Sequence, residues 1–278
     1  MPVAHRALLL PLLLLPVLRA PAQDAGQPAV FLMVYGGLAS GQTLWRVGQP
    51  LCVWQTVPGG YQCESAPSGI VNDTLTLSRR VGTGFTAGVG LAKYFTPAFG
   101  GRLDFWYAEE SFEDRCGATA FQTDSSQKNQ QTCTSFAMDH ASLSLVGLAG
   151  SALFRPFPNG GLSPYVRLGV GIVLPTGETL AASGAFTANA TQLDRQMIQD
   201  SSGQGPRPYG VLAVGLQSGA GVTSRVQLEL TDAIVPLTRI TGPADIAGRA
   251  PQATLLTHHF SATVGIVLVF SGRRGRRY

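Results

Sequence analysis

The segment that decides the fold is Tyr165-Val166-Arg167-Leu168-Gly169-Val170-Gly171-Ile172-Val173-Leu174. Every second residue from Val166 to Leu174 is aliphatic, and the residues between them are glycines with a tyrosine, an arginine and a valine. Alternation of period two is typical of a β-strand whose two faces meet different surroundings. This segment therefore predicts a strand with one aliphatic face and one face of small or polar residues.

Three more segments repeat the alternation clearly, at residues 102–108, 211–217 and 225–231, and three repeat it more weakly, at 85–91, 143–153 and 260–270. Residues 29–37 are apolar on both faces and are assigned to a strand from their β-branched and aromatic content. Together these segments predict eight strands, at residues 29–37, 82–95, 101–112, 140–156, 163–176, 207–218, 224–237 and 256–270.

The connections between these strands fall into two classes. Three are short and rich in Pro and Gly, at residues 96–100, 157–162 and 219–223, whereas four are long and polar, at 38–81, 113–139, 177–206 and 238–255. Strict alternation of the two classes is typical of a barrel with short periplasmic turns and long extracellular loops. The sequence therefore predicts an all-β fold, an antiparallel transmembrane β-barrel of eight strands with four long extracellular loops. A ten-stranded barrel, with an extra hairpin around Leu51 to Gln62, is the alternative.

The ends of the chain differ from the rest. A short basic region ending at Arg6 precedes an apolar run from Ala7 to Leu18, and Ala20-Pro21-Ala22 fits the pattern that signal peptidase cleaves. This pattern predicts secretion through the Sec pathway. The expected organisation is a signal peptide at 1–22, a barrel domain at 23–270 and a basic tail at 271–278.

Composition agrees with membrane insertion. The chain is 45% hydrophobic and 13% charged, against about 25% charged residues in ordinary soluble domains. An exported apolar chain without a spanning helix must close its backbone hydrogen bonds in a barrel. A soluble all-β carrier is the competing architecture, but its outer face would carry more charge. The positive net charge comes from the two ends, so we expect no nucleic-acid partner.

The last predicted strand, Thr263-Val264-Gly265-Ile266-Val267-Leu268-Val269-Phe270, carries a resemblance to a known family. It resembles the assembly signal of the small outer-membrane barrels of the OmpA/OmpX type, with Thr263, Gly265, Leu268 and Phe270 at its characteristic positions. In that family the aromatic residue is commonly the last one, whereas here Ser271 to Tyr278 follow. The resemblance implies a Gram-negative outer membrane, recognition by the barrel-assembly machinery, contact with outer-membrane lipid and two periplasmic termini. We expect a monomer.

Charged residues occur on the predicted inner face of the barrel. A polar group inside a narrow barrel must find a partner, and an eight-stranded barrel is just wide enough for side chains to fill it. We therefore expect a paired network that plugs the lumen, with a conduction pathway as the alternative. Its members are Arg102, Asp104, Glu110, Arg167, Arg225 and Glu229.

All four cysteines lie in predicted extracellular loops. Cys52 and Cys63 share one loop, and Cys116 and Cys133 share another. Three connectivities are open in principle, but two disulfides within the loops are favoured in an exported protein. A zinc site is disfavoured because the chain has no Cys-x-x-Cys and no histidine in either loop. We expect no metal and no cofactor.

One arrangement invites an enzymatic interpretation. His259 and Ser261 are two residues apart and share one face of the last strand. This pair resembles the base and nucleophile of the outer-membrane lipid A deacylases. A triad also needs a carboxylate that orients the histidine, and no Asp or Glu follows Ser261. The expectation is therefore no enzymatic activity, with a lipid hydrolase at the outer rim as the alternative.

The long loops favour a role in surface interaction or adhesion. Residues 38–81 and 113–139 far exceed the roughly 12–15 residues usual for an unstructured connection. Loops of this kind suit an extracellular ligand, such as host matrix, complement regulators or phage. Aromatic anchors dominate binding energy at interfaces, which gives the candidate contacts Trp45, Leu51, Val53, Trp54 and Tyr61. Packing of these residues within the loop's own hairpin is the alternative.

Overall fold

The computed structural model describes residues 29–271 except for residues 59, 68, 119–126, 139–140, 158–160, 177–179, 189, 200–204, 220–223 and 246. The predicted signal peptide at 1–22 lies outside the described residues, as does the basic tail beyond Ser271. None of the helices among the described residues is long and apolar enough to cross a membrane.

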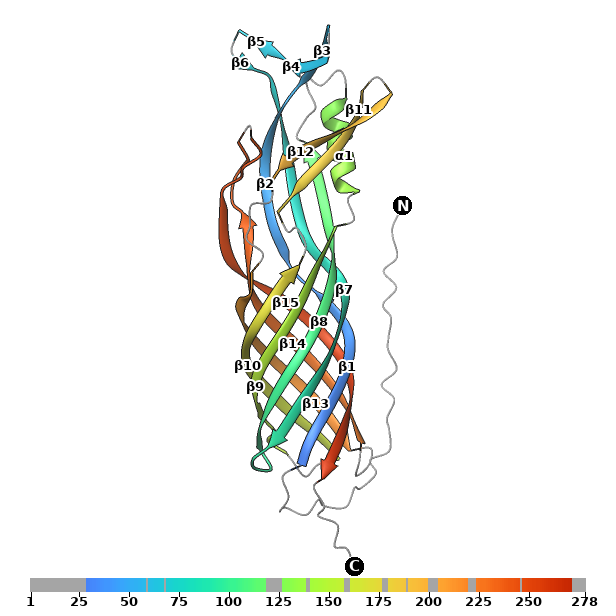
Figure 1. Ribbon diagram of the computed structural model, residues 1–278, viewed down its shortest axis with the longest axis vertical. Coiled ribbons are helices and arrows are strands. Elements are labelled where there is room, and N and C mark those ends of the chain that lie inside the picture. The colour runs from blue at the N-terminus through green and yellow to red at the C-terminus, as the bar shows by residue number, and fades with distance from the viewer. Residues whose placement is uncertain are drawn as a thin grey trace, which may run out of the picture.

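Eight antiparallel strands form a closed ring (Figure 1), because β1 pairs with both β7 and β15. The prediction of an eight-stranded barrel is confirmed, although several strands extend further at their outer ends than the alternation indicated. The strands of the ring are β1 (Ala29–Ser40), β7 (Asn72–Tyr94), β8 (Phe99–Ala118), β9 (Ser142–Phe154), β10 (Leu162–Thr176), β13 (Arg207–Gly219), β14 (Ser224–Ile240) and β15 (Gln252–Ser271).

The two faces of the ring follow the predicted alternation. Leu168 and Val170 on β10 are 65% and 73% exposed, whereas Arg167, the residue before Leu168, is 4% exposed and points inward. Aromatic side chains are exposed near the short turns, at Phe95, Phe99, Phe154 and Phe157. An aliphatic outer belt with such a girdle is typical of a barrel surrounded by lipid.

The long connections are folded rather than irregular. β2 (Thr43–Cys52) pairs with the outer end of β7, and β3 (Trp54–Val57) with β4 (Gly60–Cys63) forms a separate hairpin, so the ten-stranded alternative is wrong. The remaining elements at this end are β5 (Ser65–Ala66), β6 (Gly69–Ile70), α1 (Lys128–Ala137), β11 (Ala182–Ala188) and β12 (Thr191–Ile198). These elements, together with β2, β3, β4 and the outer ends of β7, β8, β14 and β15, rise above the ring (Figure 1), and we call them the cap.

A β-bulge in β7 marks the boundary between ring and cap. The register with β8 shifts between Val81 and Gly84, so β7 gains one residue there. One extra residue exchanges the two faces of a strand. Odd-numbered apolar residues therefore face outward below the bulge, as at Val89, and inward above it, as at Leu77, which is fully buried.

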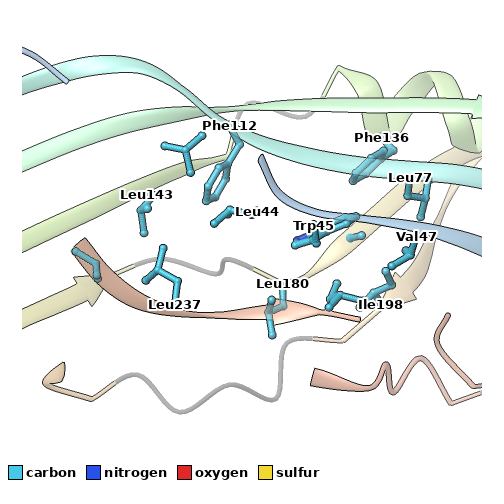
Figure 2. Packing of buried hydrophobic residues seen from close by; sticks show 14 of the residues in the cluster. Leu44, Trp45, Val47, Leu77, Phe112, Phe136, Leu143, Leu180, Ile198 and Leu237 are labelled. Carbon is cyan, nitrogen blue, oxygen red and sulfur yellow. The ribbon is translucent and has the colours of Figure 1, made fainter. Parts of the chain in front are cut away.

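The cap has an apolar core of its own (Figure 2). Leu44, Trp45 and Val47 of β2 point into it, and the ring of Trp45 stacks on Phe136 of α1 at 6.3 Å between centroids. Residues from the outer ends of the ring strands and from the other connections complete the core, including Leu77, Phe112, Leu143, Leu180, Ile198 and Leu237. The four long connections therefore fold together as one unit.

One charged residue lies within this apolar core. Arg79 is 1% exposed and makes two hydrogen bonds to Asp114, at 2.7 Å from Nε to Oδ1 and 2.6 Å from Nη2 to Oδ2. Its guanidinium also lies over the ring of Phe112 at 4.7 Å. Bidentate pairing and contact with an aromatic face are the two interactions that allow a buried arginine.

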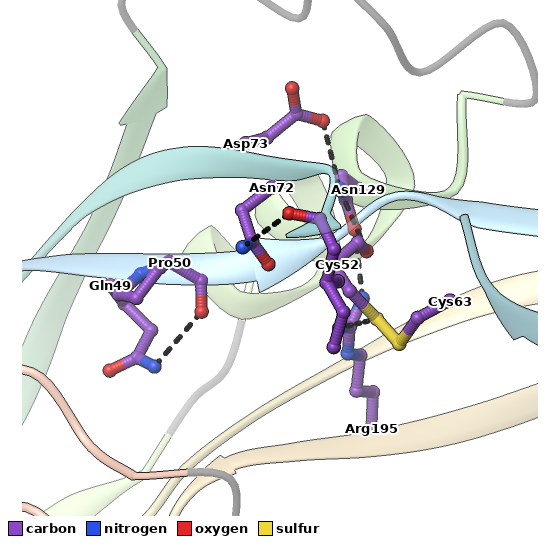
Figure 3. The surroundings of a disulfide bond; sticks show 9 residues. Gln49, Pro50, Cys52, Cys63, Asn72, Asp73, Asn129 and Arg195 are labelled. Carbon is purple, nitrogen blue, oxygen red and sulfur yellow. Dashed lines mark hydrogen bonds between the residues drawn. A yellow bond between two sulfur atoms is a disulfide. The ribbon is translucent and has the colours of Figure 1, made fainter. Parts of the chain in front are cut away.

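Polar contacts and disulfides connect the cap elements to one another (Figure 3). Cys52 is bonded to Cys63, and Cys116 of β8 is bonded to Cys133 of α1, as the sequence predicts. Asn129 of α1 donates a hydrogen bond to Asp73 at 2.8 Å and accepts one from Arg195 of β12 at 2.8 Å. Three separate connections therefore meet at Asn129.

We expect Phe136→Ala to destabilise the cap by about 3–5 kcal/mol, because it removes a fully buried aromatic ring from the core. Met138→Ala is the matched control, since Met138 follows the same helix and is 64% exposed. Amide hydrogen exchange of the folded barrel would measure both variants. Equal protection of the cap amides in the two variants would contradict the importance of this core.

Candidate functional site

The lumen of the ring contains a cluster of four charged side chains. Arg102 Nη1 lies 3.0 Å from Glu229 Oε2, and Arg102 Nε donates to Asp104 Oδ1 at 2.7 Å. Arg167 joins the same two carboxylates, at 2.6 Å to Glu229 and 3.1 Å to Asp104. All four side chains are at most 5% exposed. Two cations and two anions thus neutralise one another inside the ring.

Neighbouring strands supply the remaining contacts of this charge cluster. The Tyr165 hydroxyl donates to Glu229 at 2.6 Å, and the Tyr35 hydroxyl donates to Asp104 at 3.3 Å. Space for these large side chains comes from glycines on the inner face. A Cβ at Gly90 would lie 2.7 Å from Asp104 Oδ1, and one at Gly215 would lie 2.3 Å from the Tyr165 ring.

Two residues of the predicted network lie outside the cluster. Arg225 donates to Gln217 at 3.5 Å and lies over the ring of Phe31 at 5.7 Å. Glu229 is paired with Arg102 and Arg167, so Arg225 is not part of the ion-paired network in which it was expected. Four residues of strand separate the two side chains by about 13 Å along β14, which is too far for direct contact.

Glu110, the other residue outside the cluster, pairs with His259. His259 Nδ1 and Glu110 Oε2 are 2.8 Å apart, and the two side chains are 5% and 0% exposed. They line a cavity of about 40 Å³ in the lumen together with Ser261, Trp106 and Tyr209. His259 and Ser261 thus face the lumen rather than the lipid-facing side of the wall.

The sequence could not identify Glu110 as the partner of His259. The two residues are 149 positions apart, and Glu110 precedes the histidine in the chain, whereas the expected carboxylate would follow Ser261. The signal that was available is the inward parity of Glu110 on β8, which it shares with Arg102 and Asp104.

The interior therefore consists of four successive layers from the short-turn end outward. A small apolar cluster that includes Phe31, Met33 and Leu153 comes first, and it is followed by the charge cluster, the cavity with Glu110 and His259, and the apolar core of the cap. The outer wall around these layers is aliphatic. In a closed ring the backbone groups hydrogen-bond to neighbouring strands, and here the outer surface is apolar. These are the two requirements for crossing a bilayer with β-strands.

This chain folds as a small β-barrel of the transmembrane type. No model of a known protein family and no curated protein matches its sequence. Among solved structures it is similar to Neisserial surface protein A, with 6% identity, 87% of this chain and 99% of the other covered, and a TM-score of 0.42. It is also similar to the outer membrane protein OprG from Pseudomonas aeruginosa, with 9% identity, 88% and 98% covered, and a TM-score of 0.45. The outer membrane protease OmpT from Escherichia coli matches at 7% identity, with 87% and 97% covered and a TM-score of 0.37.

The candidate loop contacts of the barrel are mostly interior residues. Trp45, Leu51 and Val53 are 3%, 6% and 2% exposed, so their expected role as surface anchors is corrected to core packing. Trp54 is half-buried against the ring of Phe186 at 5.8 Å. The side chain of Tyr61 lies outside the described residues. β2 alternates like a ring strand, which places its apolar residues inside the cap.

The proposed assembly-signal residues lie on β15 of the barrel. Thr263 is buried and faces the lumen, whereas Leu268 and Phe270 are 40% and 55% exposed on the lipid side. Gly265 lies beside Tyr35 of β1, and a Cβ there would lie 2.9 Å from the Tyr35 Cβ. This strand pairs with β1 and thereby closes the ring.

Replacing Glu229 by Gln is expected to lower the free energy of unfolding of the barrel by about 3–5 kcal/mol, because it leaves Arg102 and Arg167 with one carboxylate between them. Glu113→Gln is the control, since Glu113 is 44% exposed and its loss costs at most about 1 kcal/mol. Urea unfolding in lipid vesicles would measure both variants. Combining Glu229→Gln with Arg102→Gln restores neutrality and should cost less than the two single changes together. Strict additivity would argue against a coupled cluster.

Proposed function

We propose that this barrel is a surface-interaction protein whose cap binds a partner outside the cell. The observation that carries the proposal is the cap itself, a folded unit with an apolar core, two disulfides and the buried pair of Arg79 with Asp114. A barrel that served only as a membrane anchor would need none of these features. A preorganised surface binds with a smaller loss of conformational entropy.

The filled lumen supports a scaffold role over a channel. The charge cluster of Arg102, Asp104, Arg167 and Glu229 occupies the width of the ring, and the cap core lies above it. In this proposal the short turns, the start of β1 and the end of β15 face the periplasm, and the cap faces the outside. The protein then has no enzymatic activity and conducts no steady ion current.

The contact surface we propose is the outermost part of the cap. The hairpin of β3 with β4 and the short pair of β5 with β6 lie at the tip farthest from the short turns (Figure 1). Ile70 in this region is 53% exposed. The tip is joined to the cap core by β2 and β7, so its position is fixed by buried residues such as Trp45.

The tip can be removed without disturbing the cap core. Val53 N donates to Val71 O at 2.9 Å, and Cys52 is the cross-strand partner of Asn72. Residues 54–70 can therefore be replaced by Asn-Gly, which forms a two-residue hairpin turn, together with Cys52→Ser. We expect the variant to insert normally and to lose the binding of expressing cells to immobilised fibronectin, laminin or complement factor H.

The double variant Cys52→Ser/Cys63→Ser is the control, because it keeps the tip and removes only its disulfide. Undiminished binding by the Asn-Gly variant would refute the role of the tip. A surface-interaction role would be refuted if cells with and without the barrel bound this panel equally, or if the purified barrel produced a steady conductance in planar bilayers.

A hydrolase is the second candidate function, favoured by the hydrogen bond between Glu110 and His259, with Ser261 lining the same cavity. A carboxylate, a base and a hydroxyl are the components of a catalytic triad. The cavity of about 40 Å³ is, however, far below the roughly 300–1,000 Å³ of ligand pockets. For this reason we expect no turnover of lipid.

The test incubates the purified barrel in outer-membrane lipid and follows lipid A and phospholipid by mass spectrometry. Turnover that disappears in Ser261→Ala and His259→Ala, and persists in the exposed control Ser111→Ala, would establish the hydrolase and overturn our expectation. No turnover by the unaltered protein would remove this candidate.

A further inference from the structure

The two disulfides of the cap differ in their surroundings. The Sγ of Cys52 accepts a hydrogen bond from Arg195 Nη2, which lies 3.7 Å away and comes from β12, a separate connection (Figure 3). Among the described residues no cationic side chain makes such a contact with Cys116 or Cys133. Cys133 is 6% exposed and belongs to the apolar core of the cap. One disulfide therefore has a guanidinium beside a sulfur, whereas the other has a sulfur in apolar surroundings.

Two further contacts hold the guanidinium of Arg195 in this position. Its Nη1 donates to Asn129 Oδ1 at 2.8 Å, and its central carbon lies 5.2 Å from the centroid of the Trp54 ring. Asn129 in turn donates to the Asp73 carboxylate at 2.8 Å and to the carbonyl oxygen of Cys52 at 3.4 Å. The acidic group of this contact chain is thus bound by the amide, and the group in contact with the sulfur is the cation. The positive charge is in place before any bond of the disulfide breaks.

A cation beside one sulfur determines how a disulfide opens. In thiol–disulfide exchange a thiolate attacks one sulfur, and the other sulfur leaves as a thiolate. A neighbouring arginine stabilises a thiolate, whereas apolar surroundings disfavour it. The contact with Arg195 therefore favours Cys52 over Cys63 as the leaving group. In the second disulfide the apolar surroundings disfavour the departure of Cys133.

The sulfur that would be attacked belongs to the tip of the cap. Cys63 is the last residue of β4 and is half-buried, and Gln62 before it is exposed. Backbone hydrogen bonds hold the base of the tip independently of the disulfide, because Val53 N donates to Val71 O at 2.9 Å and Glu64 N donates to Val53 O at 2.7 Å. The disulfide can therefore open while the tip keeps its place on the cap.

We propose that the disulfide of Cys52 and Cys63 is a site of reversible modification by a small thiol outside the cell. The sulfur of the external thiolate forms a bond to Cys63 Sγ, and the bond between Cys63 Sγ and Cys52 Sγ breaks. The electron pair of the broken bond stays on Cys52, whose thiolate is stabilised by Arg195. The products are a mixed disulfide at Cys63 and a thiolate at Cys52, so the step needs no oxidant or reductant besides the thiol. Attack of Cys52 on Cys63 reverses it. This exchange does not depend on whether the tip binds a partner.

The experiment incubates the purified full chain in detergent micelles with millimolar reduced glutathione, quenches with acid, alkylates free thiols and locates each modification by peptide mass spectrometry. We expect glutathione on Cys63, the alkyl group on Cys52, and an intact disulfide between Cys116 and Cys133. Arg195→Gln is expected to react about 3-fold more slowly or less, because the departing thiolate loses its cation. Arg195→Lys keeps the charge and should react at nearly the rate of the unaltered protein.

Arg249→Gln is the matched control, because Arg249 is 73% exposed in another part of the cap and its loss should leave the rate unchanged. Amide hydrogen exchange of the cap verifies that each variant keeps its fold. Opening of both disulfides at equal rates would overturn the proposal, as would a glutathione adduct mainly on Cys52, since Cys63 would then be the leaving group. An unchanged rate in Arg195→Gln, or an equal loss in Arg195→Gln and Arg195→Lys, would refute stabilisation of the thiolate by the charge.

Discussion

Closure of the backbone ladder between β1 and its two neighbours is the constraint on which the rest of the structure depends. Hydrocarbon offers no partner to an amide, so every spanning residue must hydrogen-bond to an adjacent strand. A ring of eight strands has an interior only wide enough for side chains. The charged and aromatic residues inside must therefore fit together, and glycines such as Gly90 and Gly215 provide the space that Asp104 and Tyr165 require.

The sequence predicted what depends on local periodicity. Seven of the eight strands and the inward position of Arg102, Asp104, Arg167 and Glu229 follow from alternation, and the strand at 29–37 follows from its β-branched and aromatic content. Pairing within the lumen was harder to predict, because contacts such as that of His259 with Glu110 join strands that are distant in the chain. Such partners depend on the stagger of the strands around the ring. The order of the residues along the sequence therefore does not identify them.

The cap was missed for a different reason. Trp45, Leu51 and Val53 lie in a connection that is polar on average, and aromatic residues in a polar loop suggest a binding surface. Their partners come from other connections, for example Phe136 of α1 against Trp45. No single loop contains an apolar core that could be recognised. The core exists only when the four connections are brought to one end of the ring.

The bulge in β7 explains how one strand serves both parts of the molecule. Its odd-numbered positions carry Leu75, Leu77 and Val81 above the bulge and Val89 and Leu91 below it, so the sequence alternates without interruption. Below the bulge the odd-numbered residues are exposed on the outer wall of the ring. Above the bulge the odd-numbered residues point inward and are buried in the cap core. The shift also turns Ser78 and Arg80 outward at that level. One inserted residue thus lets a single strand present its apolar side to the outside of the ring at one end and to the cap core at the other.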